Sequence, residues 1–299
     1  MNILITGSSG QLGQAIKKNF SFQKKYKIFL YSKKKLNINN YEKINKLISR
    51  ENIFLIINCA AFTNVDKAEL KKKEANKINN QALYNISKVV RSNDILLIHI
   101  STDYVYNSER KILIEENFTT NPKNYYGLTK LKGVKQILKI KPKAIIIRTS
   151  WLYSEFSSNF VKNIIKKIDL NEQINLNNNS YGSPTNANDL AKFIIKILKT
   201  KGYTNFFEKN AIFNFSNSGC INRYKFVKRI INLYNPKYNH KVLLKISNDN
   251  NSYIRPKCSC ISSKYAKKIF KFNDLKWDKS LMKCIKDIKK KGQLIINEL

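Results

Sequence analysis

Histidine is almost missing from this chain of 299 residues, which contains only His99 and His240. A zinc site or a histidine-based catalytic triad needs partners that two distant histidines do not supply. Long apolar runs are missing too, since none approaches the ~20 residues that a membrane-spanning helix requires. The first 15 residues also lack the charged segment with which a signal peptide begins. We therefore expect a cytoplasmic protein with no metal site and no membrane contact.

Cysteine is sparse, and its positions show neither a disulfide framework nor the paired spacing of metal ligands. Even the closest pair, Cys258 and Cys260, has a single residue between its members. We therefore expect free or buried thiols in a reducing compartment. The five cysteines are Cys59, Cys220, Cys258, Cys260 and Cys284.

Acidic residues are few, because 20 of them face 56 lysines and arginines, which gives a formal net charge of +36. A basic surface attracts nucleic acid when its charges gather in an arm or stripe. Here the lysines are spread over almost every segment, so we interpret the excess as a compositional bias and expect no nucleic-acid partner. The positive charge would still attract an anionic nucleotide substrate.

Strand and helix patterns alternate through the first half of the chain. Such an alternation predicts an α/β fold with a Rossmann-like, doubly wound parallel sheet. Residues 95–101 form a continuous apolar run, as expected for a strand that is buried on both faces. We expect strands at 2–6, 28–31, 54–58, 95–101 and 144–148, and helices at 11–20, 41–49, 75–92 and 126–138.

The pattern becomes less regular beyond residue 150. We expect an NAD(P)-binding domain over 1–150, to which 185–217 returns, and a smaller substrate-binding lobe formed by 151–184 and 218–299. No linker rich in glycine, proline and serine separates the two, so the lobe should pack closely on the first domain. Here we expect helices at 159–168, 187–199, 224–234 and 279–290, a strand at 211–216 and a polar loop at 175–180.

A glycine turn lies between the first predicted strand and the first predicted helix. Small residues at this junction let the backbone approach a pyrophosphate, and the helix amides then face the negative charge. The spacing differs from the Gly-x-Gly-x-x-Gly form of many dehydrogenases, so a simple glycine turn stays an alternative. The expected cofactor residues of this turn are Gly7, Gly10, Gln11, Leu12 and Gly13.

Ser32 and Lys33 follow the second predicted strand, where no carboxylate is placed to bind a ribose diol. A hydroxyl and a lysine suit a 2′-phosphate, so we expect NADPH as the cofactor. A solvated loop is the alternative explanation for lysines at this position, and NADH then remains a candidate.

Tyr126 and Lys130 stand four residues apart, about one helical turn, so the two side chains share a face. A nearby ammonium favours the phenolate, and we therefore expect Lys130 to lower the pKa of Tyr126. Thr102 ends the apolar run 95–101, at the sheet edge where open α/β folds bind ligands. These positions predict reduction of a ketone, with hydride from a nicotinamide and a proton from Tyr126.

Several separated blocks make the sequence similar to a known family. The chain resembles the extended short-chain dehydrogenase/reductase superfamily and, within it, the dTDP-4-dehydrorhamnose reductases. Residues 65–69 (Val-Asp-Lys-Ala-Glu) and 148–151 (Arg-Thr-Ser-Trp) are the most specific parts of the resemblance. The blocks are 58–69, 101–106, 126–130, 148–153, 181–185 and 255–256.

The resemblance implies a reaction and a role for individual residues. It implies that NADPH reduces dTDP-4-dehydro-L-rhamnose to dTDP-L-rhamnose, the last step in making a sugar donor for surface polysaccharide. Thr102 matches the catalytic hydroxyl, Tyr126 the acid and Lys130 its partner. Cofactor contacts are implied for Asn37, Ala60, Ala61 and Thr63, and nucleotide-sugar contacts for Val65, Asp103, Tyr104, Trp151 and Arg255.

Alternatives stay open for some of these assignments. The alternative role of Trp151 is packing in the core as an aromatic residue. The alternative role of Arg255 is an exposed salt bridge. Gln14 and Ala15 stand where some relatives carry a glutamate of a magnesium-bridged dimer, so magnesium and the choice between monomer and homodimer stay open. Phe62 replaces a histidine of some relatives. Rival functions are an epimerase or reductase of another 4-keto sugar nucleotide, and a non-catalytic nucleotide-binding subunit.

Overall fold

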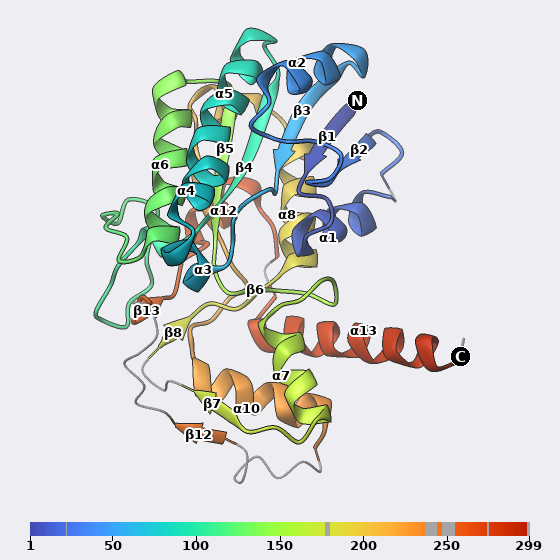
Figure 1. Ribbon diagram of the computed structural model, residues 1–299, viewed down its shortest axis with the longest axis vertical. Coiled ribbons are helices and arrows are strands. Elements are labelled where there is room, and N and C mark those ends of the chain that lie inside the picture. The colour runs from blue at the N-terminus through green and yellow to red at the C-terminus, as the bar shows by residue number, and fades with distance from the viewer. Residues whose placement is uncertain (22, 177–179, 237–243, 247–254, 274, 298–299) are drawn as a thin grey trace.

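Six parallel strands form the central sheet, in the spatial order β10-β5-β4-β3-β1-β2 (Figure 1). The structure is a computed structural model, which describes the chain except residues 22, 177–179, 237–243, 247–254, 274 and 298–299. The strand order reverses between β1 and β3, and this switch point opens a crevice at the carboxyl ends of the strands. The strands are β1 (Asn2–Thr6), β2 (Lys27–Tyr31), β3 (Ile53–Asn58), β4 (Leu96–Thr102), β5 (Ala144–Thr149) and β10 (Ile212–Phe215).

Helices cover both faces of this sheet. One face carries α1 (Gln11–Phe20) and α8 (Ala187–Lys199), and the other carries α2 (Tyr41–Arg50), α5 (Ala82–Ser92) and α6 (Tyr125–Ile140). Successive residues of a strand point to opposite faces, so Ile3 and Ile5 join one apolar cluster whereas Leu4 joins the other. The predicted doubly wound α/β fold is confirmed.

A third apolar cluster lies below the sheet in Figure 1. It is built from α7 (Phe160–Asp169), α10 (Arg223–Tyr234) and α13 (Trp277–Asn297), beside the strand pair β7 (Ile174–Leu176) and β12 (Leu244–Ile246). Short pieces of chain connect this cluster with the sheet. They include β6 (Leu152–Tyr153), β8 (Tyr181–Gly182), β9 (Thr185–Asn186), β11 (Ile221–Asn222) and β13 (Cys258–Ser259). The short helices α9 (Thr204–Glu208) and α12 (Lys264–Phe270) pack on the sheet instead, against β5 and β10.

None of the helices in the described part of the chain has both the length and the apolar character needed to cross a bilayer. The helix expected at 279–290 is longer in the structure, where α13 ends at Asn297. The other predicted helix and strand positions agree with the structure to within a few residues, except in two places. The polar loop expected at 175–180 is partly wrong, because Asn175 and Leu176 belong to β7; residues 177–179 lie outside the described residues.

The helix expected at 75–92 is interrupted, and this is the second difference. The chain forms α4 (Lys72–Asn76), a π-helical turn η1 (Lys77–Gln81) and then α5. Within the turn, the Asn79 amide binds the backbone N–H and C=O of Phe62 and the Thr129 hydroxyl. Gly133 of α6 approaches so closely that a Cβ there would lie 2.0 Å from the Asn79 carbonyl oxygen. These tertiary contacts favour the wider turn, which the local pattern could not show.

Cys220 and Cys260 form a disulfide, which corrects the expectation that every cysteine is a free thiol. The two residues are 40 apart in sequence, and their Cα atoms lie 5.3 Å apart. Cys220 precedes β11 and α10, and Cys260 follows β13. The fold brings these distant segments together, and spacing along the chain gave no signal of it. Cys59, Cys258 and Cys284 are free.

Replacing Cys220 with serine will lower the free energy of unfolding by roughly 4 kcal/mol, because the cross-link restricts the unfolded chain. Denaturant unfolding without reductant measures this change. Cys258→Ser is the matched control, since Cys258 is buried but unbridged. A thiol reductant should destabilise the unaltered protein and this control, and leave Cys220→Ser unchanged. Equal sensitivity of all three proteins to reductant would contradict the bridge.

Candidate active site

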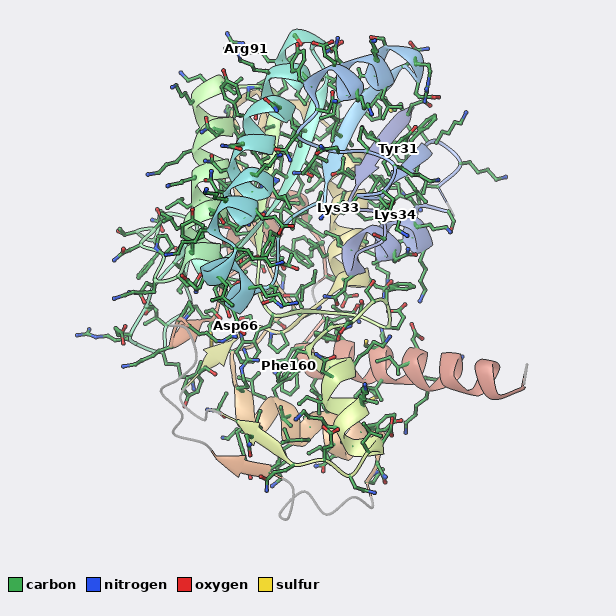
Figure 2. The ribbon with its side chains drawn as sticks, in the orientation of Figure 1. Tyr31, Lys33, Lys34, Asp66, Arg91 and Phe160 are labelled. Atoms are coloured by element: carbon green, nitrogen blue, oxygen red, sulfur yellow. A yellow bond between two sulfur atoms is a disulfide. The ribbon has the colours of Figure 1, made fainter. Side chains whose placement is uncertain are left out.

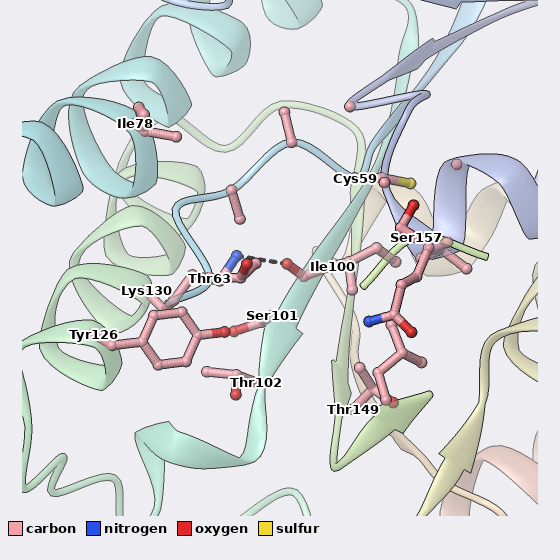
Figure 3. Close-up of a pocket in the computed structure, with 18 of the residues that line it drawn as sticks. Cys59, Thr63, Ile78, Ile100, Ser101, Thr102, Tyr126, Lys130, Thr149 and Ser157 are labelled. Atoms are coloured by element: carbon pink, nitrogen blue, oxygen red, sulfur yellow. Dashed lines mark hydrogen bonds between the residues drawn. The ribbon is translucent and has the colours of Figure 1, made fainter. Parts of the chain in front are cut away.

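A cavity of about 940 Å³ lies at the carboxyl ends of the sheet strands, between the sheet and the α7–α10 cluster. Figure 3 shows part of its lining. It brings together all the site residues expected from the sequence except Ser32. Those residues are Gly7, Gly10, Gln11, Leu12, Gly13, Lys33, Asn37, Ala60, Ala61, Thr63, Val65, Thr102, Asp103, Tyr104, Tyr126, Lys130, Trp151 and Arg255.

The glycine turn forms one end of this cavity. Gly7 has φ +65°, and a Cβ there would lie 2.6 Å from the backbone nitrogen of Ala60. Gly13 packs against the same turn, since its Cβ would lie 2.5 Å from the Cα of Ser8. Side chains would therefore fill the space, and the glycines leave bare backbone next to the N-terminus of α1. Such a surface suits the diphosphate of a dinucleotide.

Lys33 and Ser32 follow β2 near this end (Figure 2 labels Lys33). Lys33 is exposed and lines the cavity, where its Nζ lies 3.6 Å from a carboxylate oxygen of Glu74. Ser32 does not line the cavity, and its carbonyl accepts hydrogen bonds from the backbone of Lys35 and Leu36 in a turn. The structure therefore separates Ser32 from the other expected cofactor residues.

Thr102 and Tyr126 meet at the middle of the cavity. Thr102 ends β4 and caps the short helix η2 (Asp103–Val105); its hydroxyl donates to Asp103 Oδ1 at 2.9 Å and accepts from the Tyr104 N–H at 3.2 Å. Tyr126, in the first turn of α6, makes a side-chain hydrogen bond with Thr102. Figure 3 shows the Tyr126 ring directed from α6 toward Ser101 and Thr102. A carbonyl oxygen placed here would meet two hydroxyl groups.

Burial sets the protonation of Tyr126 and Lys130. It raises the pKa of the Tyr126 phenol well above its usual value, although the hydrogen bond between Tyr126 and Thr102 lowers that pKa. It lowers the pKa of Lys130 to about 7; Cys59 opposes this shift only when its thiol is ionised, and burial raises the pKa of that thiol to about 12. The expectation that Lys130 lowers the pKa of Tyr126 is therefore wrong. The physical reason is that desolvation outweighs attraction between the two groups, so Tyr126 is kept as a phenol, the form that donates a proton.

Asp103 is a buried carboxylate beside Thr102. Burial raises the pKa of Asp103 to about 6, although hydrogen bonds involving Ser259, Thr102 and Ser150 lower it. Ser150 Oγ lies 3.0 Å from Asp103 Oδ2 and 3.0 Å from the Ser259 carbonyl oxygen. Asp103 therefore ties the end of β4 to the segment after β5 and to β13 while it also faces the cavity.

Trp151 carries the clearest backbone strain in the cavity wall. Its φ of +41° lies in the left-handed region, which a bulky residue rarely adopts. The indole lies against Gly182, where a Cβ would be 2.1 Å from Trp151 Cε2. It also packs on Phe226, with ring centroids 6.0 Å apart. Trp151 thus packs against the core, as the alternative from sequence expected, and it also lines the cavity; its contact with the sugar stays a prediction.

Two guanidinium groups line the same wall. Arg255 Nη2 contacts both carboxylate oxygens of Asp66, at 2.6 and 2.7 Å, so the expected salt bridge exists. Arg223, which the sequence did not reveal, begins α10 and stacks 4.0 Å from the Trp151 ring centroid. Burial, together with the charge of Arg255, lowers the pKa of Arg223, although both residues line the cavity. Paired cations at this end suit an anionic ligand.

Other lining residues were also missed from sequence, among them Ser157, Ser158 and Phe160. Ser157 donates to the Ser9 carbonyl at 2.9 Å, so it connects the loop after β6 with the glycine turn. No sequence signal pointed to this contact, because it joins residues 148 apart. Within the described residues, no group of three or more histidine, cysteine, aspartate or glutamate side chains could hold a metal ion.

Known proteins share this architecture and sequence. The family model described as "RmlD substrate binding domain" matches residues 1–290. A dTDP-4-dehydrorhamnose reductase of Aggregatibacter actinomycetemcomitans is 30% identical over 75% of this chain and 76% of that protein. The Salmonella typhimurium reductase is 32% identical over 64% of each chain.

Solved structures agree with these sequence matches. A dTDP-4-dehydrorhamnose reductase from Clostridium acetobutylicum is 30% identical, with a TM-score of 0.85 over 97% of this chain and 100% of that one. The Bacillus anthracis reductase, solved in complex with NADP, is 29% identical, with a TM-score of 0.86 over 96% and 98%. These matches show that the chain belongs to the dTDP-4-dehydrorhamnose reductase family, whose model is described as the RmlD substrate binding domain.

Proposed function

We propose that this protein reduces the 4-keto group of dTDP-4-dehydro-L-rhamnose with NADPH to give dTDP-L-rhamnose, the closing step in making a rhamnose donor for surface polysaccharide. The observation that carries the proposal is a single cavity that is lined by the glycine turn, by the Thr102–Tyr126 pair and by two arginines. The cavity can hold two ligands side by side, a dinucleotide at the glycine turn and a sugar diphosphate at the arginines. Relatives that carry this name support the substrate.

The residues at the glycine end fit a nicotinamide dinucleotide. The cradle formed by Gly7 and Ala60 would be filled by any Cβ at position 7. The buried hydroxyls of Ser101 and Thr149 line the cavity and have no hydrogen-bond partner among the described residues. When bound, the cofactor supplies a hydride from the nicotinamide C4. Lys33 would then hold the 2′-phosphate, Asn37 would lie by the adenine, and Ala60, Ala61 and Thr63 would cover the dinucleotide.

Tyr126 supplies the proton in this proposal. The ketone carbon gains a hydride, its oxygen gains the phenolic proton of Tyr126, and the phenolate is then reprotonated from solvent. Thr102 would exchange its hydrogen bond to Asp103 Oδ1 for one to the same oxygen and so orient it. Because burial keeps the Tyr126 pKa high, the phenol is present throughout the neutral range. Lys130 positions Tyr126 and the cofactor ribose.

The opposite end would hold the nucleotide sugar. Val65, Asp103, Tyr104 and Trp151 surround the sugar, and Arg255 with Arg223 binds its diphosphate. Arg255 would exchange some of its contact with Asp66 for the phosphate. We propose that 151–184 and 218–299 form this substrate lobe on a cofactor domain of 1–150 and 185–217. The cytoplasmic location stays a prediction, and so does the oligomeric state, monomer or homodimer.

The experiment that tests the function is incubation of purified protein with dTDP-4-dehydro-L-rhamnose and NADPH, following NADPH absorbance. A panel of other dTDP-4-keto sugars is run in parallel, because a similar Streptomyces niveus protein is named a dTDP-4-keto-6-deoxy-D-glucose reductase. The proposal requires the highest kcat/KM on dTDP-4-dehydro-L-rhamnose. No turnover by folded protein on any sugar of the panel would favour the non-catalytic alternative.

Tyr126→Phe will lower kcat by roughly 10²-fold or more while cofactor affinity stays nearly unchanged, because only the proton donor is removed. Tyr125→Phe is the matched control, since Tyr125 is the adjacent tyrosine of α6 but does not line the cavity. Steady-state kinetics and cofactor titration measure both variants. Near-normal kcat in Tyr126→Phe would mean that another group donates the proton.

Lys33→Ala will raise the KM for NADPH about 10-fold and leave the KM for NADH unchanged, because only NADPH carries a 2′-phosphate for this cation to bind. Lys34→Ala is the neighbouring control; Lys34 is exposed and does not line the cavity. Initial rates at varied concentrations of NADPH or NADH give the KM of each variant for each cofactor. Equal changes for NADH and NADPH would assign Lys33 to the solvated loop instead.

A further inference from the structure

The Cys220–Cys260 bridge joins the two outer strands of a small sheet beside the active-site cavity. This sheet has the strand order β11-β8-β13. Cys220 directly precedes β11, and Cys260 directly follows β13, so the bridge spans the central strand β8. Gly182 of β8 lies against the indole of Trp151, which lines the cavity. The bridge therefore closes the small sheet on which this part of the cavity wall rests.

The two sulfur atoms of the bridge differ in their access to solvent. Cys260 is 0% exposed, whereas Cys220 is partly exposed. Cys220 also lines a second cavity, of about 450 Å³, which shares no lining residue with the active-site cavity. Because exchange between a thiol and a disulfide depends on which sulfur can be reached, a thiolate from solution meets the bridge at Cys220.

This second cavity has a cationic lining. Lys111 and Lys225 are both exposed, and Lys111 Nζ lies 4.9 Å from the centroid of the Tyr181 ring. No aspartate or glutamate is among the described residues of the lining, so nothing there offsets the two ammonium groups. An anion of low molecular weight is the ligand that such a small basic cavity favours. The described lining residues are Lys111, Tyr181, Cys220, Ile221, Asn222, Tyr224 and Lys225.

We propose that Cys220 is a site of reversible modification by an anionic thiol of low molecular weight. The thiolate attacks Cys220 Sγ and forms a mixed disulfide with it. The bond to Cys260 Sγ breaks, its electron pair leaves with Cys260, and that sulfur takes a proton from water. One disulfide replaces another, so no further oxidant or reductant is consumed. Attack by the Cys260 thiolate on Cys220 releases the small thiol and restores the bridge.

The modification reaches the active site through the residues next to each cysteine. Ser259, beside Cys260, accepts from Ser150 Oγ at 3.0 Å and makes a hydrogen bond with Asp103 of the cavity. On the other side, β11 leads from Cys220 directly to Arg223. Opening the bridge frees these two parts of the wall from each other. This consequence rests on the proposed function, because it concerns the end of the cavity assigned to the nucleotide sugar.

Two single-cysteine variants test which sulfur reacts. Cys260→Ser leaves Cys220 as a thiol, and Cys220→Ser leaves Cys260, so glutathione disulfide traps a stable adduct on whichever thiol it reaches. We expect one glutathione on Cys220 in the first variant, formed roughly 10-fold or more faster than any adduct on Cys260 in the second. Mass spectrometry of the tryptic peptides 210–223 and 258–264 locates the adduct. Equal rates, or a faster adduct on Cys260, overturn the proposal.

The unaltered protein gives the same test if either variant fails to fold. Alkylation in denaturant without reductant should label Cys59, Cys258 and Cys284 only. A short exposure to reduced glutathione before alkylation should then place glutathione on peptide 210–223 and an alkyl group on Cys260. Labelling of all five cysteines at the start, or glutathione on peptide 258–264, overturns the proposal.

The charge of the second cavity is tested in the Cys260→Ser protein. Adding Lys111→Ala and Lys225→Ala should lower the rate with glutathione disulfide about 3-fold and leave the rate with neutral 2-hydroxyethyl disulfide unchanged. Lys166→Ala with Lys196→Ala is the matched control, because these lysines are exposed, line neither cavity and remove the same charge. Equal rates of glutathione disulfide with the two double variants overturn the selection of an anionic thiol.

Ligand binding tests the effect on the active site. When the bridge is open, the KM for the nucleotide sugar should rise about 5-fold while the KM for NADPH stays unchanged, because the glycine turn lies at the other end of the cavity. Cys258→Ser, with its bridge intact, should behave as the unaltered protein. Calorimetric titration with dTDP-L-rhamnose measures the same change without turnover. Binding that weakens on opening in a protein without turnover refutes the reductase and supports the coupling; unchanged binding overturns the coupling.

Discussion

The burial of the Lys130 amine is the constraint on which the arrangement of the site depends. A lysine that is 2% exposed cannot keep its charge cheaply, because the cavity wall gives back little of the lost hydration. The structure answers this by hydrogen-bonding the nitrogen to the Ile100 carbonyl and to His99, and by keeping anions away from it. Tyr126, desolvated in the same place, stays a phenol for the same reason. Desolvation is therefore the largest cause of the pKa shifts of both groups.

This geometry is held by close backbone contacts around α6. A Cβ at Gly127 would lie 2.2 Å from the Tyr104 carbonyl oxygen, so the helix begins directly against η2 and its neighbour Thr102. One and a half turns later, Gly133 rests on the π-helical turn at Asn79. With both contacts in place, α6 has little freedom to slide, and Tyr126 stays at the end of β4. The two glycines thus help to hold Tyr126 at the end of β4.

The wall opposite the glycine turn is assembled from segments far apart in the sequence. Trp151 has a strained backbone, and its indole contacts both Gly182 and the guanidinium of Arg223. Arg255 arrives from near β13, and the Cys220–Cys260 bridge joins that region to the start of α10. Strain, stacking and a cross-link therefore act together on the side of the cavity that is proposed to bind the sugar diphosphate. The result is a cationic wall whose two guanidinium groups come from different elements.

The sequence by itself determined the local structure and the residue types of the chemistry. Apolar periodicity located α8 at Ala187–Lys199 and each sheet strand to within a residue or two, because those patterns are written in neighbouring positions. The glycine turn and the Tyr126–Lys130 spacing were likewise local. Only the tertiary structure decided the Cys220–Cys260 bridge, the π-helical turn, the place of Arg223 and the direction of the Tyr126 pKa. Each of these depends on contacts between residues far apart in the sequence, or on the loss of hydration when the fold is complete. The spacing of residues along the chain shows neither the contacts nor the loss of hydration.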